Sequence, residues 1–90
     1  MELHGQVAIV TGAGGGIGRA TALELARMGA DVVVAELDRA NAESTASELR
    51  GLGRRALVVQ TDVTSRDDLR AMVEQTRAEF GRIQSRDIVA

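Results

Sequence analysis

Several residue types on which protein chemistry commonly depends are missing from this sequence. Its 90 residues include no cysteine, no tyrosine and no tryptophan, and all eleven basic residues are arginine. Without cysteine, disulfides, thiolate metal ligands and thiol nucleophiles are excluded. Without tyrosine and lysine, chemistry that needs a phenol or an amine cannot be carried out by these residues. The single aromatic residue, Phe80, leaves no stacking surface for single-stranded nucleic acid.

Charge and length narrow the class of protein further. The net charge is −2, and the arginines are scattered among a comparable number of carboxylates, so we expect no nucleic-acid partner. No apolar run approaches the ~18 residues that a membrane span needs, and no signal-peptide pattern opens the sequence, so we expect a cytoplasmic protein with no membrane partner. Ninety residues with a hydrophobic content of 44% fit one small globular domain.

The apolar pattern predicts strands and helices in strict alternation. Strands are expected at 7–10, 31–36 and 56–59, and helices at 17–28, 39–52 and 65–80. Short, wholly apolar strands are typical of a parallel sheet that is covered on both faces. The order β-α-β-α-β-α therefore predicts an α/β protein with a partial Rossmann fold and right-handed connections. Residues 87–90 would add a fourth strand to these three.

Two features of the packing are also expected. In the first helix, Arg19, Glu24 and Arg27 fall within one arc when projected at about 100° per residue, so the helix should be mostly buried. In a doubly wound sheet the first strand is interior and pairs with the fourth. We therefore expect an open apolar edge on the first strand, which would allow the chain to associate with another copy.

A glycine-rich turn joins the first strand to the first helix. Residues 11–18 read Thr-Gly-Ala-Gly-Gly-Gly-Ile-Gly. Glycines let the backbone turn sharply, and the unpaired N–H groups at a helix start attract an anion such as the pyrophosphate of a dinucleotide. An acidic residue, Glu36, ends the next strand 18 positions after Gly18, near the roughly 20 of dinucleotide-binding folds. The alternatives are a plain strand-to-helix connector and a solvated carboxylate.

These residues resemble the TGxxxGIG signature of the short-chain dehydrogenase/reductase family. Three further segments agree in order and spacing: Val34-Ala35-Glu36-Leu37-Asp38, Asp62-Val63-Thr64 and Glu79-Phe80-Gly81-Arg82-Ile83. The resemblance covers residues 3–83. It implies that residues 1–90 are the dinucleotide-binding first half of a Rossmann domain, with no second domain. The sequence after Ile83 departs from the family through an apparent insertion at residues 84–86.

The resemblance also assigns roles to seven residues. It implies that Gly12, Gly16 and Gly18 shape the turn against the pyrophosphate, and that Ile17 lies beside the phosphate on the nicotinamide side. Glu36 would accept hydrogen bonds from the hydroxyls of the adenosine ribose, whereas Asp62 and Val63 would hold the adenine ring. An ordinary turn before a helix is the alternative interpretation of Asp62.

The cofactor implied is NAD in preference to NADP. A carboxylate at position 36 suits two neutral hydroxyls and repels a 2′-phosphate. In relatives that prefer NADP, a basic residue commonly replaces what is here Gly15 or Leu37, and neither is basic. Arg39 could turn toward a 2′-phosphate, although an exposed position in the first turn of a helix is the simpler interpretation.

The family transfers a hydride between the nicotinamide and an alcohol or carbonyl, using Tyr, Lys and Ser. None of these can be placed here, and Ser85 should not be taken for the catalytic serine. We therefore assign no catalytic residue and no metal site, and we expect the chain to be inactive alone. Two alternatives to a cofactor-binding half are a non-catalytic nucleotide-binding or interaction module and a fragment without function.

Overall fold

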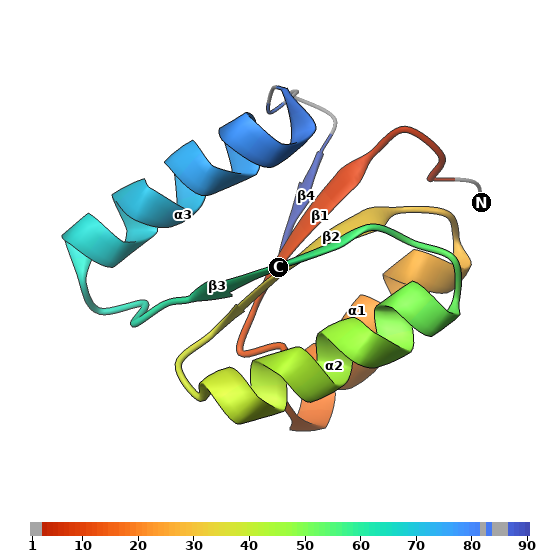
Figure 1. Cartoon of the computed structure of the whole chain (residues 1–90), viewed down its shortest axis with the longest axis horizontal. Coiled ribbons are helices and arrows are strands. Elements are labelled where there is room, and N and C mark those ends of the chain that lie inside the picture. Colours follow the sequence, from red (N-terminus) through yellow and green to blue (C-terminus); the bar gives the residue numbers. More distant parts are fainter. Residues whose placement is uncertain (1–2, 82, 84–86) are drawn as a thin grey trace.

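Seven elements alternate along the chain in a computed structural model that describes residues 3–81, 83 and 87–90 (Figure 1). The strands are β1 (Val7–Thr11), β2 (Asp31–Glu36), β3 (Ala56–Gln60) and β4 (Ile88–Val89), and the helices are α1 (Gly16–Arg27), α2 (Arg39–Gly51) and α3 (Arg66–Phe80). This order confirms the predicted α/β class and the fourth strand. The bounds of the first six elements agree with the sequence prediction to within one residue at each end. The insertion inferred at residues 84–86 lies outside the described residues.

The strands form one parallel sheet in the order β3-β2-β1-β4. On one side of β1, Ile9 pairs with Val33 of β2; on the other, it pairs with Val89 of β4. The last residue extends this ladder, because the Ala90 N–H donates to the Ile9 carbonyl at 2.9 Å and the Ala90 carbonyl accepts from the Thr11 N–H at 2.8 Å. The expected open edge on β1 is therefore wrong. Self-association through an edge stays a prediction, now for the outer side of β4 or β3.

Helices cover the two faces of the sheet unequally. Figure 1 shows α1 and α2 together on one face and α3 on the other. Successive strand residues alternate between these faces, as the pleat requires. Toward α1 and α2 point Ala8, Val10, Val32 and Val34, and toward α3 point Val7, Ile9, Val33 and Ala35. Burial on both faces explains why these strands have almost no polar residues.

Small side chains dominate the core beneath α1 and α2. Ala22 and Ala26 of α1 and Ala42 and Ala46 of α2 are buried there, with Leu49 beside them. The prediction that α1 is mostly buried is wrong, since only Ala22 and Ala26 of this helix are buried. The helical period identifies the apolar arc correctly, but α1 packs on β1, β2 and α2 mainly along its alanine side. Its leucines are therefore only half-buried.

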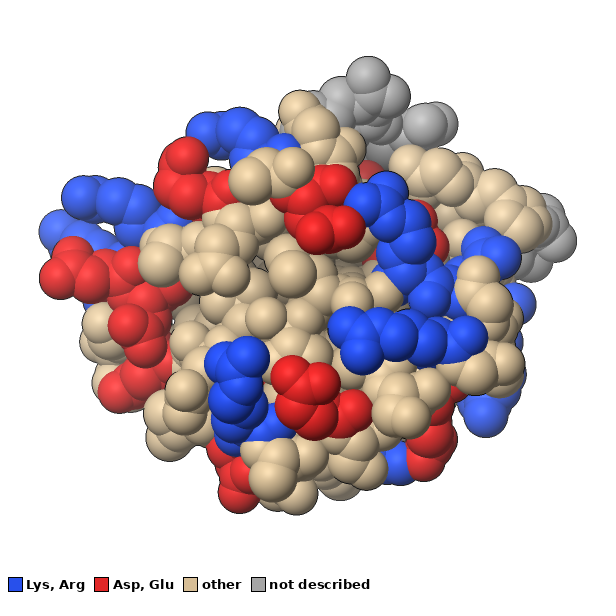
Figure 2. Space-filling view, in the orientation of Figure 1, with Lys and Arg blue, Asp and Glu red and all other residues tan. Residues whose placement is uncertain are grey.

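Two structural features are absent from the described residues, 3–81, 83 and 87–90. No helix there is both long enough and apolar enough to cross a membrane. Those ranges also contain no group of three or more His, Cys, Asp or Glu residues that could hold a metal ion. On the face drawn in Figure 2, arginines and carboxylates are interspersed around a central area of uncharged residues.

Candidate functional site

All seven residues predicted from the sequence lie at one end of the sheet. Because the strands are parallel, the segments that follow β1, β2 and β3 meet at their carboxyl ends. The glycine-rich turn is joined to β2 by a 2.8 Å hydrogen bond from the Gly12 N–H to the Ala35 carbonyl. The loop after β3 is joined to β2 by a 3.1 Å bond from the Thr61 N–H to the Glu36 carbonyl. The structure thus brings the three predicted segments together.

The glycine-rich turn requires glycine at three positions for two different reasons. Gly12 and Gly16 adopt left-handed conformations, with φ of +63° and +54°, which residues with a side chain rarely adopt. At Gly18 the limit is space, because a Cβ atom would lie 2.1 Å from the Gly12 carbonyl oxygen. The first turn of α1 therefore packs directly on the backbone of the loop. Sequence reasoning identified these three glycines, and the structure gives each one a physical reason.

The start of α1 differs from the starts of the other two helices. Asp38 caps α2 by accepting from the Asn41 N–H at 3.0 Å, and Ser65 caps α3 by accepting from the Asp68 N–H at 3.2 Å. In contrast, α1 follows Gly15, which has no side chain with which to cap the helix. The N–H groups of its first turn and the positive end of its dipole are therefore available to an anion.

The carboxylate of Glu36 is fixed beside this helix start. Its Oε1 accepts a hydrogen bond from the Gly14 N–H at 2.9 Å, and its Oε2 accepts one from the Asp38 N–H at 2.9 Å. The side chain is half-buried between the glycine-rich turn and α2, so it is not the freely solvated carboxylate of the alternative interpretation. A carboxylate has about four acceptor positions, and these two bonds leave capacity for a ligand's hydroxyl groups.

Asp62 occupies a turn before α3. Its Oδ1 accepts from both the N–H and the hydroxyl of Thr64, at 2.9 and 2.6 Å, and its own N–H donates to Asp68 Oδ2 at 2.9 Å. The Thr64 hydroxyl, followed by the Thr64 N–H, holds the pKa of the Asp62 carboxyl below its ordinary value. This geometry is that of the ordinary turn, and the role of Asp62 toward adenine stays a prediction.

Three large apolar side chains are exposed at the same end of the sheet. Ile17, Leu37 and Val63 are 87%, 61% and 52% exposed, and they belong to the segments after β1, β2 and β3 respectively. In open parallel sheets, ligands bind at the carboxyl ends of the strands, which is where these three segments begin. Leu37 was not among the predicted site residues, although its place directly after Glu36 could have identified it.

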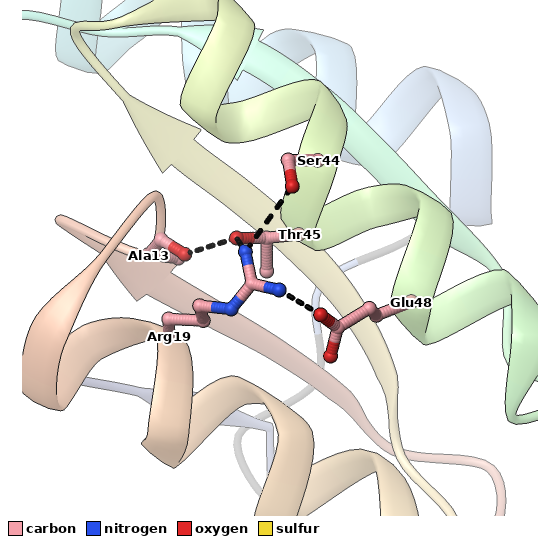
Figure 3. A network of polar contacts seen from close by, with 5 residues as sticks. All are labelled: Ala13, Arg19, Ser44, Thr45 and Glu48. Carbon is pink, nitrogen blue, oxygen red and sulfur yellow. Dashed lines mark hydrogen bonds and ion pairs between the residues drawn. The ribbon is translucent and has the colours of Figure 1, made fainter.

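The buried residue Thr45 is hydrogen-bonded to the glycine-rich turn and was missed by the sequence reasoning. The Thr45 hydroxyl of α2 donates to the Ala13 carbonyl at 2.9 Å and accepts from the Arg19 guanidinium at 3.3 Å (Figure 3). The same guanidinium also pairs with Glu48 and reaches Ser44. This network connects the glycine-rich turn, α1 and α2. No local pattern reveals it, since its partners lie 25 to 32 positions apart.

Gly14 is the third residue that the sequence reasoning missed, after Leu37 and Thr45. It is buried, and a Cβ atom there would lie 2.6 Å from Glu36 Cγ and 2.8 Å from Asn41 Cβ. In the TGxxxGIG signature this position is one of the unspecified ones, so the motif gives no reason to single it out.

Comparison with known proteins agrees with this geometry. A family model described as short chain dehydrogenase matches residues 6–85. The short chain dehydrogenase/reductase astE of Aspergillus oryzae is 50% identical over 83 residues, which are 91% of this chain and 32% of that protein. A hydroxysteroid dehydrogenase from Escherichia coli superposes with a TM-score of 0.91 at 35% identity, over 98% of this chain and 36% of that one.

A second solved structure contains a cofactor. It is a 7α-hydroxysteroid dehydrogenase in complex with NADH and 7-oxo glycochenodeoxycholic acid, and it matches with a TM-score of 0.88 at 35% identity, over 92% of this chain and 32% of that one. The chain thus spans about a third of the length of each of these three relatives. The turn, the parallel sheet and these matches together show that the chain belongs to the short-chain dehydrogenase/reductase family, whose members bind nicotinamide dinucleotides.

Proposed function

We propose that residues 1–90 form the NAD-binding first half of a dehydrogenase's Rossmann domain, with no second domain among them. The observation that carries this proposal is the Glu36 carboxylate, fixed by two backbone N–H groups beside the uncapped start of α1. The helix start, with its unpaired N–H groups, suits the anionic diphosphate of an adenosine diphosphate. The carboxylate beside it suits the hydroxyl groups of the ribose.

The residues at this end of the sheet fit the remaining parts of such a cofactor. Gly12, Gly16 and Gly18 would let the diphosphate approach the backbone, where the N–H groups of the first turn of α1 would donate to it. Ile17 would lie toward the nicotinamide. The adenine ring would rest among Asp62, Val63 and Leu37, the last two being exposed apolar side chains. When bound, the nicotinamide supplies a site that accepts or donates a hydride.

Charge at position 36 favours NAD over NADP. Two unit charges 4 Å apart repel by about 1 kcal/mol in water and about 4 kcal/mol at an effective dielectric constant of 20. A 2′-phosphate near Glu36 would meet this repulsion, and the Arg39 guanidinium, which could offset it, lies 3.9 Å from the carboxylate of Glu43. We expect NAD to bind at least about tenfold more tightly than NADP, which corresponds to about 1.4 kcal/mol.

We further propose that hydride transfer belongs to the longer family proteins and that this polypeptide binds the cofactor without turnover. Its sequence contains neither the tyrosine nor the lysine that the family uses. A cytoplasmic location is part of the same proposal. A non-catalytic nucleotide-binding module is the second candidate, and it shares every binding residue with the first.

Isothermal titration calorimetry with NAD and NADP tests the binding proposal. Glu36→Gln keeps the side chain's size and removes its charge, so we expect about tenfold weaker NAD binding and a smaller preference over NADP. Glu74→Gln removes the same charge from an exposed residue of α3, on the opposite face from α1, and should bind as the parent chain does. Equal NAD affinities for the parent chain and Glu36→Gln would contradict the proposal, as would a parent chain that binds neither dinucleotide.

A further inference from the structure

We propose that Gly14 is a specificity-determining residue, because the space left by its missing side chain holds Glu36 in the position that selects NAD. This inference rests on the proposed function and names a residue to which the TGxxxGIG motif gives no role. Two observations support it: Gly14 donates its N–H to Glu36 Oε1 at 2.9 Å, and its Cα faces the Glu36 side chain directly.

The space at Gly14 is occupied from two sides. A Cβ atom there would lie 2.6 Å from Glu36 Cγ, 2.7 Å from Glu36 Oε1 and 2.8 Å from Asn41 Cβ. Carbon atoms pack at about 3.5–4.0 Å, so none of these contacts is tolerable. Asn41 Cβ is attached to the backbone of α2 and cannot rotate away, whereas the Glu36 side chain can. An added methyl group would therefore displace the carboxylate first.

Displacing the carboxylate removes one of its two backbone donors. The Asp38 N–H, which binds Oε2 at 2.9 Å, would remain as the anchor, and it lies at the start of α2. The carboxylate would then be held by α2 alone and no longer beside the glycine-rich turn. The adenosine ribose would lose its acceptor and a 2′-phosphate would lose its nearest repelling charge, so the ratio of the two affinities would move toward one.

The neighbouring glycine provides a matched control. Gly15 has extended backbone with φ of −168°, which any residue adopts, and no described atom lies within 4 Å of its ideal Cβ position. Alanine at position 15 adds the same methyl group to the same turn without touching Glu36. The two substitutions therefore separate contact with Glu36 from a general effect on the turn.

The experiment measures Kd for NAD and NADP with the parent chain, Gly14→Ala, Gly15→Ala, Glu36→Ala and the double variant Gly14→Ala/Glu36→Ala. We expect Gly14→Ala to lower the preference for NAD about tenfold, as expected for the loss of a hydrogen bond to a charged group. Gly15→Ala should keep a preference close to that of the parent chain. In the double variant, Gly14→Ala should add nothing to Glu36→Ala, since the atoms it displaces are already gone.

Other outcomes overturn the inference. These are an unchanged preference in a folded Gly14→Ala chain, an equal loss in Gly15→Ala, or a further loss in the double variant. A simple loss of stability would weaken NAD and NADP alike and leave their ratio unchanged. If Gly14→Ala does not fold, a folded double variant supports the steric argument, whereas an unfolded one assigns the conflict to Asn41 and overturns the role of Glu36.

A second readout needs no cofactor and separates this inference from the proposed function. The amide resonance of Gly14 should differ between the parent chain and Glu36→Ala, because the hydrogen bond to Glu36 Oε1 is lost, and it should be the same in the parent chain and Glu74→Gln. An amide resonance of Gly14 that does not change when the Glu36 side chain is removed overturns the contact on which the inference depends. If this resonance does change, but the chain binds no dinucleotide, the contact is supported, whereas the proposed function and the role in cofactor preference are both overturned.

Discussion

Replacing Gly18 by alanine should destabilise the chain, although alanine is the better helix former. Gly18 lies in the first turn of α1, where a Cβ atom would come within 2.1 Å of the Gly12 carbonyl oxygen and 2.7 Å of the carbonyl carbon. Both atoms belong to a backbone fixed in a left-handed turn, so no side-chain rotation can relieve the overlap. The helix and the loop must move apart instead.

The size of the effect follows from two opposing contributions. Overpacking costs about 1–3 kcal/mol, and contact with backbone atoms at this distance places Gly18→Ala at the upper end. The helix preference of alanine over glycine offsets about 1 kcal/mol of this. The net loss should be about 2 kcal/mol, which lowers the melting temperature of a domain of this size by about 8–16 °C.

Gly51 offers the same substitution without the conflict. It is the last residue of α2, and no described atom lies within 4 Å of its ideal Cβ position. Alanine there should stabilise the chain by about 0.4–1 kcal/mol, because it restricts the unfolded chain. Urea unfolding followed by far-ultraviolet circular dichroism would measure both free energies. The packing argument fails if Gly18→Ala is as stable as the parent chain or as Gly51→Ala.

Two further predictions concern the support of the site. Thr45→Val should lower the free energy of unfolding by about 1–3 kcal/mol, because the buried Ala13 carbonyl loses its donor, and Thr45→Ser should restore most of the loss; equal unfolding midpoints for the valine and serine variants would contradict the role of the hydroxyl. Asp62→Asn should be less stable than the parent chain at neutral pH, because the hydrogen bonds from Thr64 that lower the pKa of Asp62 stabilise its ionised form. The difference in stability should disappear as the pH falls from about 4, the ordinary value of an aspartate, through the lower pKa of the folded state. Urea midpoints measured across this pH range would test that pattern, and a difference that persisted in acid would refute it.

Most of the architecture could be predicted because its signals are local. The run Val32 to Val34 is apolar throughout, as a doubly covered strand must be, and Asp38 and Ser65 mark the helix starts that they cap. Gly12 and Gly16 were singled out by the resemblance to the TGxxxGIG signature, and the left-handed conformations that they adopt are ones that glycine favours. Each of these signals depends on a few neighbouring residues, and physical chemistry gives them one favoured geometry.

What could not be predicted depends on residues that are distant in the sequence. Thr45 lies between buried positions of α2 and looks like an ordinary core threonine until Ala13 and Arg19 are placed beside it. Gly14 matters because Glu36 folds back onto it from 22 positions away. Periodicity identified the apolar arc of α1 correctly, but how far an arc is covered depends on which elements pack against it.

The pairing of β1 with β4 has a mechanical consequence for the proposed cofactor site. Thr11, the residue before Gly12, donates its N–H to the carbonyl of Ala90, which lies 79 positions later in the sequence. The end of β4 is thus hydrogen-bonded to the last residue of β1, directly before the glycine-rich turn. A nucleotide that stabilises this turn would also stabilise the pairing of β4 with β1. Fraying of β4 would weaken nucleotide binding by the same coupling free energy.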